Sequence, residues 1–240
     1  MKQPASFLTA EWRYLVMLNY HIDPALLRPF LPTGTELDSW QDQTFVSIVG
    51  FMFLNTRMLG LPIPGHINFE ELNLRFYVRR KGPEGWRRGV VFIKELVPRW
   101  AIATTARLVY NENYISLPMR HEIISGAEET AVSYQWRWQK AWHSVQIKAV
   151  GQPQPLRPGS QEEFIAEHYW GYAKQRDGGT VEYQVEHPPW NVWQAQSHQF
   201  NCDVASLYGP TFAPALQATP ASAFLADGSA VTVRRGVRII

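Results

Sequence analysis

The ionisable residues that could carry chemistry in this sequence concentrate in one predicted β-strand. Residues Asn68 to Arg80 alternate apolar side chains with polar and charged ones. Successive side chains of a strand point to opposite faces, so Glu71, Asn73 and Arg75 are expected to share one face while the leucines share the other. The polar face therefore combines a carboxylate, an amide and a guanidinium group.

The next predicted strand, Arg87 to Arg99, also ends in ionisable residues. A continuous apolar run precedes Lys94 and Glu95, which is the pattern of a strand covered on both faces. Folding the two strands about their Gly- and Pro-containing loop brings Glu71 roughly opposite Lys94, to within about two residues. A salt bridge between this carboxylate and ammonium group is preferred to a catalytic role for Lys94.

The polar face of this hairpin has two interpretations. On the outer surface of a sheet, its side chains would form ion pairs worth about 0 to 1 kcal/mol. On the inside of a closed barrel, the same side chains would converge on a cavity and bind a ligand. The periodicity of the sequence alone does not distinguish the two.

Further polar residues lie on the strand predicted near the N-terminus, at 12–20. Arg13, Asn19 and His21 share its odd-numbered face, so all three are candidates to face a cavity. For His21, a hydrogen-bonded core histidine is preferred to a proton carrier.

The composition favours a mostly β protein with many turns. The 240 residues are 45% hydrophobic and include 10 Trp, 10 Tyr and 12 Phe alongside 17 Pro and 16 Gly. Aromatic residues favour strands, while Gly and Pro mark the turns between them. We expect a single domain over residues 1–240, because all-β barrels of this length commonly form one domain.

The elements that must position the polar residues are short. Strands are predicted at 12–20, 44–53, 68–80, 87–99 and 131–150, and again in the last third of the chain. A helix at 23–32 is predicted from Asp23 as N-cap and Pro24 at the first helical position. Further helices are predicted at 99–110 and at 162–172, where Ser160 and Glu163 fit the capping-box pattern. The stripe of Trp136, Trp138 and Trp142 is expected in the core or at the interface of a homo-oligomer.

The sequence gives no support for a nucleic-acid-binding, secreted or membrane-spanning protein. The net charge is +2 and the basic residues are dispersed, so no nucleic-acid partner is expected. Cys202 is the only cysteine, which fits a reducing compartment. The N-terminal residues lack the pattern of a signal peptide, and no run of about 18 apolar residues occurs, so we expect a cytoplasmic protein without a membrane partner.

Metal and cofactor motifs are also missing. The seven histidines are not spaced as metal ligands. The glycine-rich patterns of nucleotide-binding loops and the nucleophile elbow of serine hydrolases do not occur. The expectation is a protein that uses no metal and no cofactor.

Five segments together resemble one known family. They read NYHIDPALLRPFLPTGTEL, FVSIVGFMF, PGHINFEELNLRFYV, RRGVVFIKELVPRWAIATTARLVYNENY and SAFLADGSAVTVRRG. This combination, which covers essentially the whole chain, is similar to the YqjF-like family of uncharacterised proteins. The resemblance implies membership of the acetoacetate decarboxylase-like superfamily, whose fold is a closed antiparallel β-barrel with a few short peripheral helices and an internal polar cavity.

The resemblance also implies site residues. The decarboxylases carry a glutamate in the strand that matches NFEELNL, for which Glu71 is the first candidate and Glu70 the second. His21 stands where they have an arginine. Their Schiff-base lysine pair follows a proline, but the matching segment here reads Pro98-Arg99-Trp100. Arginine stays protonated and does not form an imine, so decarboxylase activity is not expected and enzymatic activity in general stays open.

The preferred hypothesis is a barrel that binds a small anionic organic molecule, either a carboxylate or a keto acid. The predicted ligand-binding residues are Arg13, Asn19, Glu70, Asn73, Arg75 and Arg99, and the predicted catalytic residues are Glu71, His21 and Lys94. If the protein is an enzyme, proton transfer by Glu71 or His21 is the expected chemistry, since burial tunes both group types toward neutral pH. The alternatives are an enzyme acting on a keto acid or related carbonyl compound, and a structural or sensory protein whose barrel is filled by side chains.

Overall fold

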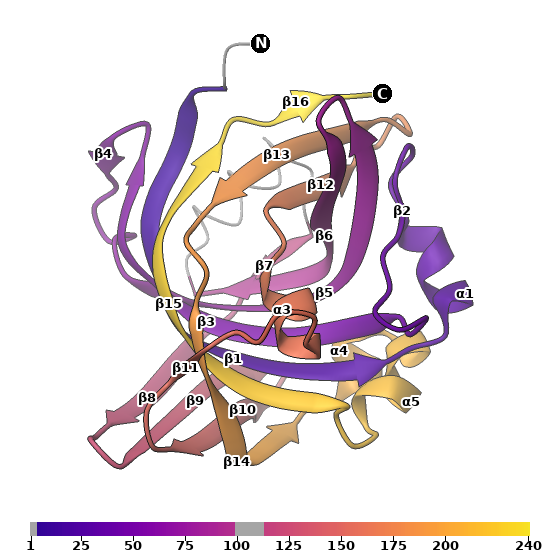
Figure 1. Cartoon of the computed structure of the whole chain (residues 1–240). Helices are drawn as coiled ribbons and strands as arrows, with labels where there is room; N and C mark the ends of the chain where they lie inside the picture. Colours follow the sequence, from indigo (N-terminus) through magenta and orange to yellow (C-terminus); the bar gives the residue numbers. More distant parts are fainter. Residues whose placement is uncertain (1–3, 99–112) are drawn as a thin grey trace.

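A computed structural model describes residues 4–98 and 113–240 of the chain. Strands dominate the structure, and the helices between them are short (Figure 1). In the described part, no helix has the length and apolar character needed to cross a membrane. The helix predicted at 99–110 lies outside the described residues.

Seven strands form a closed ring, which confirms the predicted fold class (Figure 1). In spatial order they are β13 (Thr180–Glu186), β12 (Trp170–Lys174), β6 (Gly85–Val97), β5 (Phe69–Gly82), β3 (Phe45–Met58), β1 (Ser6–His21) and β15 (Ser222–Arg234). Pairing of β15 with β13 closes the ring. Its neighbouring strands are antiparallel except β12 and β6, which pair in parallel.

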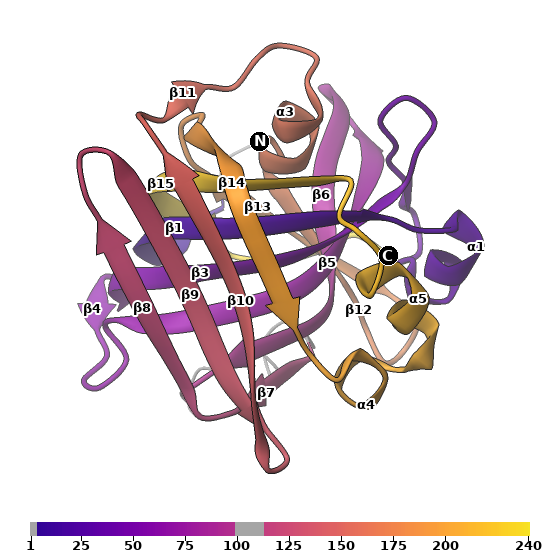
Figure 2. The same ribbon diagram turned by 90° about the horizontal axis from the view of Figure 1, so that it is seen from below.

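A second sheet lies across the outside of the ring (Figure 2). It consists of β14 (Asn191–Asn201), β10 (Ala141–Val150), β9 (Glu129–Trp138) and β8 (Met119–Ser125). Strand β14 joins the two layers, because its first residues pair with β15 and the residues from Ala195 onward pair with β10. The remaining short strands are β2 (Glu36–Leu37), β4 (Leu61–Pro62), β7 (Tyr114–Ser116), β11 (Gln154–Pro155) and β16 (Val237–Arg238).

The alternation of the sequence separates two cores. Leu72, Leu74 and Phe76 point out of the ring and pack with Tyr134 and Trp136 of the second sheet. A separate set of buried residues fills much of the ring interior, including Met17, Phe51, Phe69, Phe164 and Phe224. The polar face of β5 is thereby turned inward, as the cavity interpretation requires.

The helices lie at the ends of strands. They are α1 (Pro24–Leu27), η1 (Arg28–Phe30), α3 (Gln161–Ala166), α4 (Val204–Tyr208), η2 (Pro210–Phe212) and α5 (Ala213–Leu216). Asp23 caps α1 as predicted, because its Oδ1 accepts a hydrogen bond from the Ala25 N–H at 2.8 Å. Ser160 caps α3 by accepting from the Glu163 N–H at 3.1 Å. Helix α3 is shorter than the predicted span of 162–172, because residues from Trp170 onward pair as β12.

Two irregularities reset the alternation of side chains. In β1, Tyr14 has a φ of 56° and the register with β3 shifts between Arg13 and Val16. In the β5–β6 hairpin, Leu74 lies opposite Lys94 but Arg75 lies opposite Phe92, so the extra residue Ile93 forms a bulge. Side chains on the two sides of each bulge no longer follow one odd–even rule.

Candidate functional site

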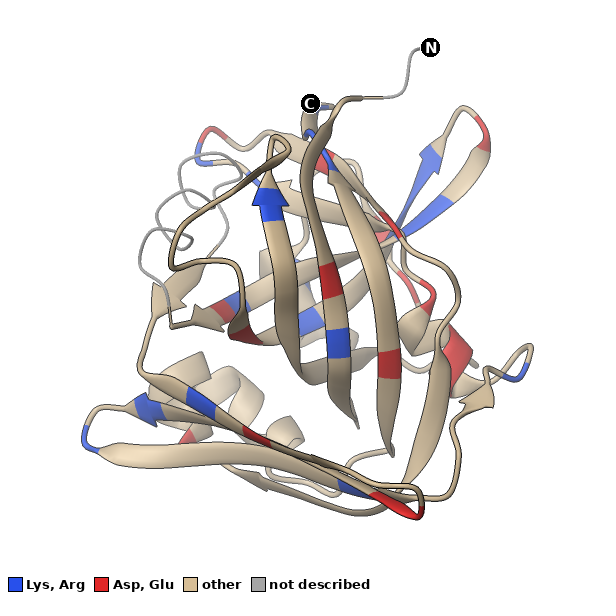
Figure 3. Ribbon diagram, turned by 90° about the vertical axis from the view of Figure 1, so that its left-hand side faces the viewer, with Lys and Arg blue, Asp and Glu red and all other residues tan. Residues whose placement is uncertain are grey.

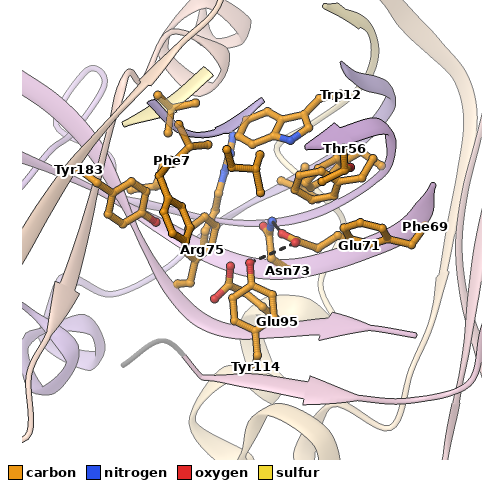
Figure 4. A pocket seen from close by; sticks show the side chains of 18 of the residues that line it. Phe7, Trp12, Thr56, Phe69, Glu71, Asn73, Arg75, Glu95, Tyr114 and Tyr183 are labelled. Carbon is orange, nitrogen blue, oxygen red and sulfur yellow. Dashed lines mark hydrogen bonds between the residues drawn. The ribbon is translucent and has the colours of Figure 1, made fainter. Parts of the chain in front are cut away.

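The interior of the ring holds a cavity of about 130 Å³. Its polar side is formed by β5 and β6, with Tyr114 of β7 beside them (Figure 4). Its apolar side is formed by β1, β3 and the start of β5, where Trp12, Phe51, Phe53 and Phe69 are in ring contact with one another. The cavity therefore has one wall suited to polar groups and one suited to hydrocarbon or aromatic groups.

Glu71, Asn73 and Arg75 line the polar side together, as predicted from their spacing (Figure 4). The Glu71 carboxylate is held from two directions, because Asn73 Nδ2 donates to its Oε1 at 3.1 Å and the Tyr114 hydroxyl donates to its Oε2 at 3.2 Å. All three β5 residues are less than a tenth exposed. The structure thus places a fixed carboxylate, an amide and a guanidinium group in a row.

Asn73 and Arg75 keep unused hydrogen-bonding capacity. Arg75 donates from one terminal nitrogen to the Ile165 carbonyl at 3.2 Å, and its Cζ lies 5.6 Å from the centre of the Tyr77 ring. Within residues 4–98 and 113–240, neither Arg75 Nε nor Asn73 Oδ1 has a hydrogen-bond partner. Buried polar atoms without partners cost about 1–3 kcal/mol each, so the pair is arranged as a ligand site would be.

The bulge at Ile93 decides which ionisable residue of β6 faces the cavity. Glu95 lies opposite Asn73, is 1% exposed and lines the cavity. Lys94 points to the other face, where its ammonium group donates to the Leu207 carbonyl and lies 6.0 Å from the Tyr208 ring centre. Burial lowers the pKa of Lys94. The predicted Lys94–Glu71 salt bridge is therefore wrong, and Lys94 does not line the cavity.

Three residues proposed for the site on β1 lie elsewhere. The bulge at Tyr14 turns Arg13 out of the ring, where its guanidinium group pairs with Glu11 at 2.7 Å. Asn19 does point inward but is satisfied by Ser47 and Ser222. His21 is exposed at the end of β1 and packs against the Phe45 ring, at 4.8 Å between centroids. None of the three lines the cavity.

Glu70 and Arg99 complete the predicted residues. Glu70 faces the outside of the ring and accepts a hydrogen bond from His121 Nδ1 at 2.6 Å. It therefore lies on the opposite face of β5 from Glu71. Arg99 lies outside the described residues.

A histidine that sequence reasoning missed also lines the cavity. His168, in the turn after α3, is buried between the rings of Tyr77 and Phe164, at centroid distances of 4.7 and 5.4 Å. Its Nε2 lies 3.7 Å from Asp38 Oδ2, and Arg88 Nε donates to the same Asp38 oxygen at 2.7 Å. No local pattern in the sequence marks these residues, because Asp38 and His168 lie in two loops that are far apart along the chain.

Burial sets the protonation of this group. Burial, with added repulsion from Arg88 and Arg75, lowers the pKa of His168 to about 4 despite the attraction of Asp38. Burial alone would raise the pKa of Asp38, but its interactions with His168 and Arg88 lower it to about 2. At neutral pH the imidazole is therefore uncharged and Asp38 is ionised.

In the ribbon of Figure 3, basic and acidic positions are both scattered over several strands and loops rather than gathered by sign in one element. Within the described residues, no three of His, Cys, Asp and Glu come together as metal ligands.

Comparison with known proteins now places the chain in a family. A family model described as uncharacterized conserved protein, DUF2071, matches residues 9–230. The chain belongs to the DUF2071 family. The YqjF protein of Bacillus subtilis (strain 168), itself described as uncharacterized, is 26% identical to this DUF2071 protein over 201 residues, covering 83% of this chain and 81% of YqjF.

Solved structures show the same fold at low identity. The enduracididine biosynthesis enzyme MppR, complexed with pyruvate, matches with a TM-score of 0.68 and 14% identity over 99% of this chain and 91% of its own. Acetoacetate decarboxylase from Legionella pneumophila matches with a TM-score of 0.66 and 14% identity over 100% and 90% of the two chains. The DUF2071 chain therefore has an acetoacetate decarboxylase-like fold, as its sequence motifs predicted.

Proposed function

We propose that this DUF2071 protein binds a small organic acid, a carboxylate or keto acid, inside the ring of strands. The observation that carries the proposal is the buried pair Arg75 and Asn73, which line the cavity while Arg75 Nε and Asn73 Oδ1 have no partner within the described part of the chain. A guanidinium group recognises a carboxylate through charge-assisted hydrogen bonds, which are the strongest that side chains make.

Arg75 lines the cavity together with the carboxyl groups of Glu71 and Glu95, and it is the group there that could anchor an acid. No described acidic residue forms an ion pair with Arg75, so an incoming carboxylate would meet a cation that is not already neutralised. Glu71 is held in place by Asn73 and Tyr114 and would disfavour a second negative charge next to it. A ligand fits both if its carboxylate lies at Arg75 and a hydroxyl group donates toward Glu71 or Asn73 Oδ1.

The size and the apolar wall limit the ligand further. A water molecule takes up about 30 Å³ in the liquid, so a cavity of about 130 Å³ suits a compact molecule rather than a drug-sized one. The aromatic side chains opposite β5 favour a ligand that carries hydrocarbon next to its acid group. Pyruvate, with which the similarly folded MppR was complexed, is a suitable first probe.

Schiff-base chemistry receives no support from the lysines. In the described part of the chain these are Lys81, Lys94, Lys140, Lys148 and Lys174, and none of them lines the cavity. Residues 99–112 contain no lysine, and the one remaining lysine of the sequence is Lys2, which lies outside the described residues. An imine needs an amine near the carbonyl carbon, so binding, with proton transfer to or from the ligand, is the function that these residues favour.

Calorimetric titration with pyruvate, acetate and phenylpyruvate tests the proposal, together with the thermal shift that bound ligand causes. The Arg75→Gln variant removes the charged anchor and is expected to weaken binding by about 10- to 150-fold, since hydrogen bonds to charged groups contribute about 1.5–3 kcal/mol. Arg79→Gln is the matched control, because Arg79 lies on the same strand but its side chain is 43% exposed and pairs with Glu36.

The two variants are expected to differ in their affinity for the acids. Arg79→Gln should bind like the unmodified protein, while Arg75→Gln should show almost no thermal shift. Equal binding by both variants would place the acid somewhere other than the β5 row. A protein that binds none of the three acids would instead favour the filled, non-catalytic interior.

A further inference from the structure

We propose that His168 is the acid–base group of this cavity and that it takes up one proton from solvent when an organic anion binds beside Arg75. The inference rests on the proposed function, because it concerns the same cavity. It adds a residue that neither the sequence motifs nor the comparisons single out, and it makes ligand binding a proton-coupled event.

His168 is packed between two aromatic rings and also borders the cavity. Its side chain is 1% exposed and lines the cavity. Within the described residues, neither ring nitrogen has a hydrogen-bond partner. Buried imidazoles are normally hydrogen-bonded, so an unsatisfied one that borders a cavity has capacity left for a ligand.

His168 and Arg75 are neighbours across the same aromatic ring. The Tyr77 ring contacts the imidazole at 4.7 Å and the Arg75 guanidinium group at 5.6 Å. Arg75 also donates to the carbonyl of Ile165, three residues before His168. Both side chains also line the same cavity, so a carboxylate bound by Arg75 would share it with the imidazole.

Asp38 and Arg88 orient the imidazole. Asp38 Oδ2 is 3.7 Å from Nε2, which favours the tautomer with its proton on Nε2 and leaves the lone pair on Nδ1. Arg88 fixes Asp38 through a hydrogen bond of 2.7 Å and also donates to the Phe164 carbonyl at 3.4 Å. Nδ1, which carries the free lone pair, is therefore the atom that accepts the proton.

The groups that face His168 explain why binding would change its charge. Arg75 and Tyr77 face it from β5, Arg88 from β6 and Asp38 from the loop after β2. Burial and the two arginines keep the imidazole neutral as long as no anion lies beside Arg75. An anion at Arg75 cancels one of these repulsions and adds an attraction, so the imidazolium form becomes favourable. The proton comes from solvent to Nδ1, and the resulting imidazolium can donate it to a carbonyl oxygen of the ligand.

Calorimetry with pyruvate in two buffers of different ionisation enthalpy measures the protons taken up per ligand bound. At pH 5.5 we expect about half to one proton for the unmodified protein, and an affinity that rises by up to about tenfold for each pH unit of acidification. His168→Phe keeps an aromatic ring between Tyr77 and Phe164 but cannot accept a proton. His198→Gln, an exposed histidine on the second sheet, is the control.

The outcomes separate this inference from the proposed function. Proton uptake that is present in the unmodified protein and in His198→Gln, and absent in His168→Phe, supports the inference. Pyruvate binding without proton uptake, or with uptake that survives in His168→Phe, overturns it while leaving the binding function intact. If pyruvate does not bind at all, the proposal for the site and this inference both fail.

A second measurement does not depend on the folding of a variant. The His168 ring protons can be followed by NMR through a pH titration of the unmodified protein with and without pyruvate. An imidazole that titrates at the same pH in both samples would contradict the inference.

Discussion

The buried, uncharged His168 should make the folded protein sensitive to mild acid. An unfolded chain protonates this histidine near its ordinary pKa of 6.5, whereas the folded chain resists protonation until about pH 4. Between these two values the unfolded state binds more protons, so the free energy of unfolding falls as the pH is lowered. This stability is present above pH 6.5 and is lost as the pH falls toward 4.

The magnitude follows from the difference between the two pKa values. At about 1.4 kcal/mol for each pKa unit, a shift of about 2.5 units corresponds to about 3 kcal/mol of stability lost between pH 6.5 and pH 4. The total stability of a folded domain is about 5–15 kcal/mol, so the loss is large enough to measure. Below pH 4 protonation of Asp38, whose pKa is lowered to about 2, should continue the decline.

Urea unfolding at a series of pH values between 4 and 7.5 measures this dependence. The comparison is with His168→Phe, in which the phenyl ring keeps the contacts with Tyr77 and Phe164 but does not titrate. The variant should show a shallower fall in stability over the same pH range, whatever its stability at neutral pH. Burial also lowers the pKa of His187, and this contribution is the same in both proteins. Parallel curves for the two proteins would refute the argument.

Three further substitutions test other parts of the structure. Gly228→Ala should lower the free energy of unfolding in urea by more than about 2 kcal/mol, because the φ of Gly228 is +78° and a Cβ there would lie 2.0 Å from a main-chain oxygen of β1. Gly60→Ala is the control and should cost about 1 kcal/mol, because Gly60 has a φ of +83° but open space around it. A similar loss of stability in both variants would contradict this reasoning. Lys94→Met should leave the affinity for pyruvate unchanged in calorimetry, because the Lys94 ammonium group lies outside the cavity. For the same reason, borohydride treatment of the unmodified protein with pyruvate should leave Lys94 unmodified. An adduct on Lys94 in mass spectrometry would disprove the site. Glu182→Gln should lower the free energy of unfolding by about 2 kcal/mol, because the buried carboxylate pairs with Arg80 and Arg87 of the β5–β6 hairpin. An unchanged urea midpoint would show that these ion pairs contribute nothing to stability.

Strict alternation made the β5 row predictable. Strand β5 pairs with β3 without interruption from Val46 opposite Phe76 to Phe53 opposite Phe69, so Glu71, Asn73 and Arg75 fall on one face as the sequence pattern indicates. Whether that face turned inward was not contained in the pattern. The resemblance to a family with a closed fold supplied this information, and the ring of strands agrees with it.

Bulges and long-range contacts were not predictable in the same way. One extra residue at Ile93 reverses the faces of Lys94 and Glu95, and the left-handed conformation of Tyr14 does the same for Arg13. Neither position has a glycine or another local signal of a bulge. His168 depends on Asp38 across the fold, so only tertiary structure reveals the pair.

The way the ring closes has a consequence for how its interior exchanges molecules with water. Strand β13 meets β15 at Val185–Val233 and Glu186–Thr232, and β12 meets β6 at Trp170–Gly89 and Gly171–Val90. The β12–β13 hairpin therefore pairs with β6 and β15 over only two residues each, whereas β1, β3 and β5 pair with one another along most of their length. Amide hydrogens of this hairpin should therefore exchange with deuterium before those of the long strands. We expect the interior of the ring to open to solvent first at this hairpin, and a small ligand to enter there.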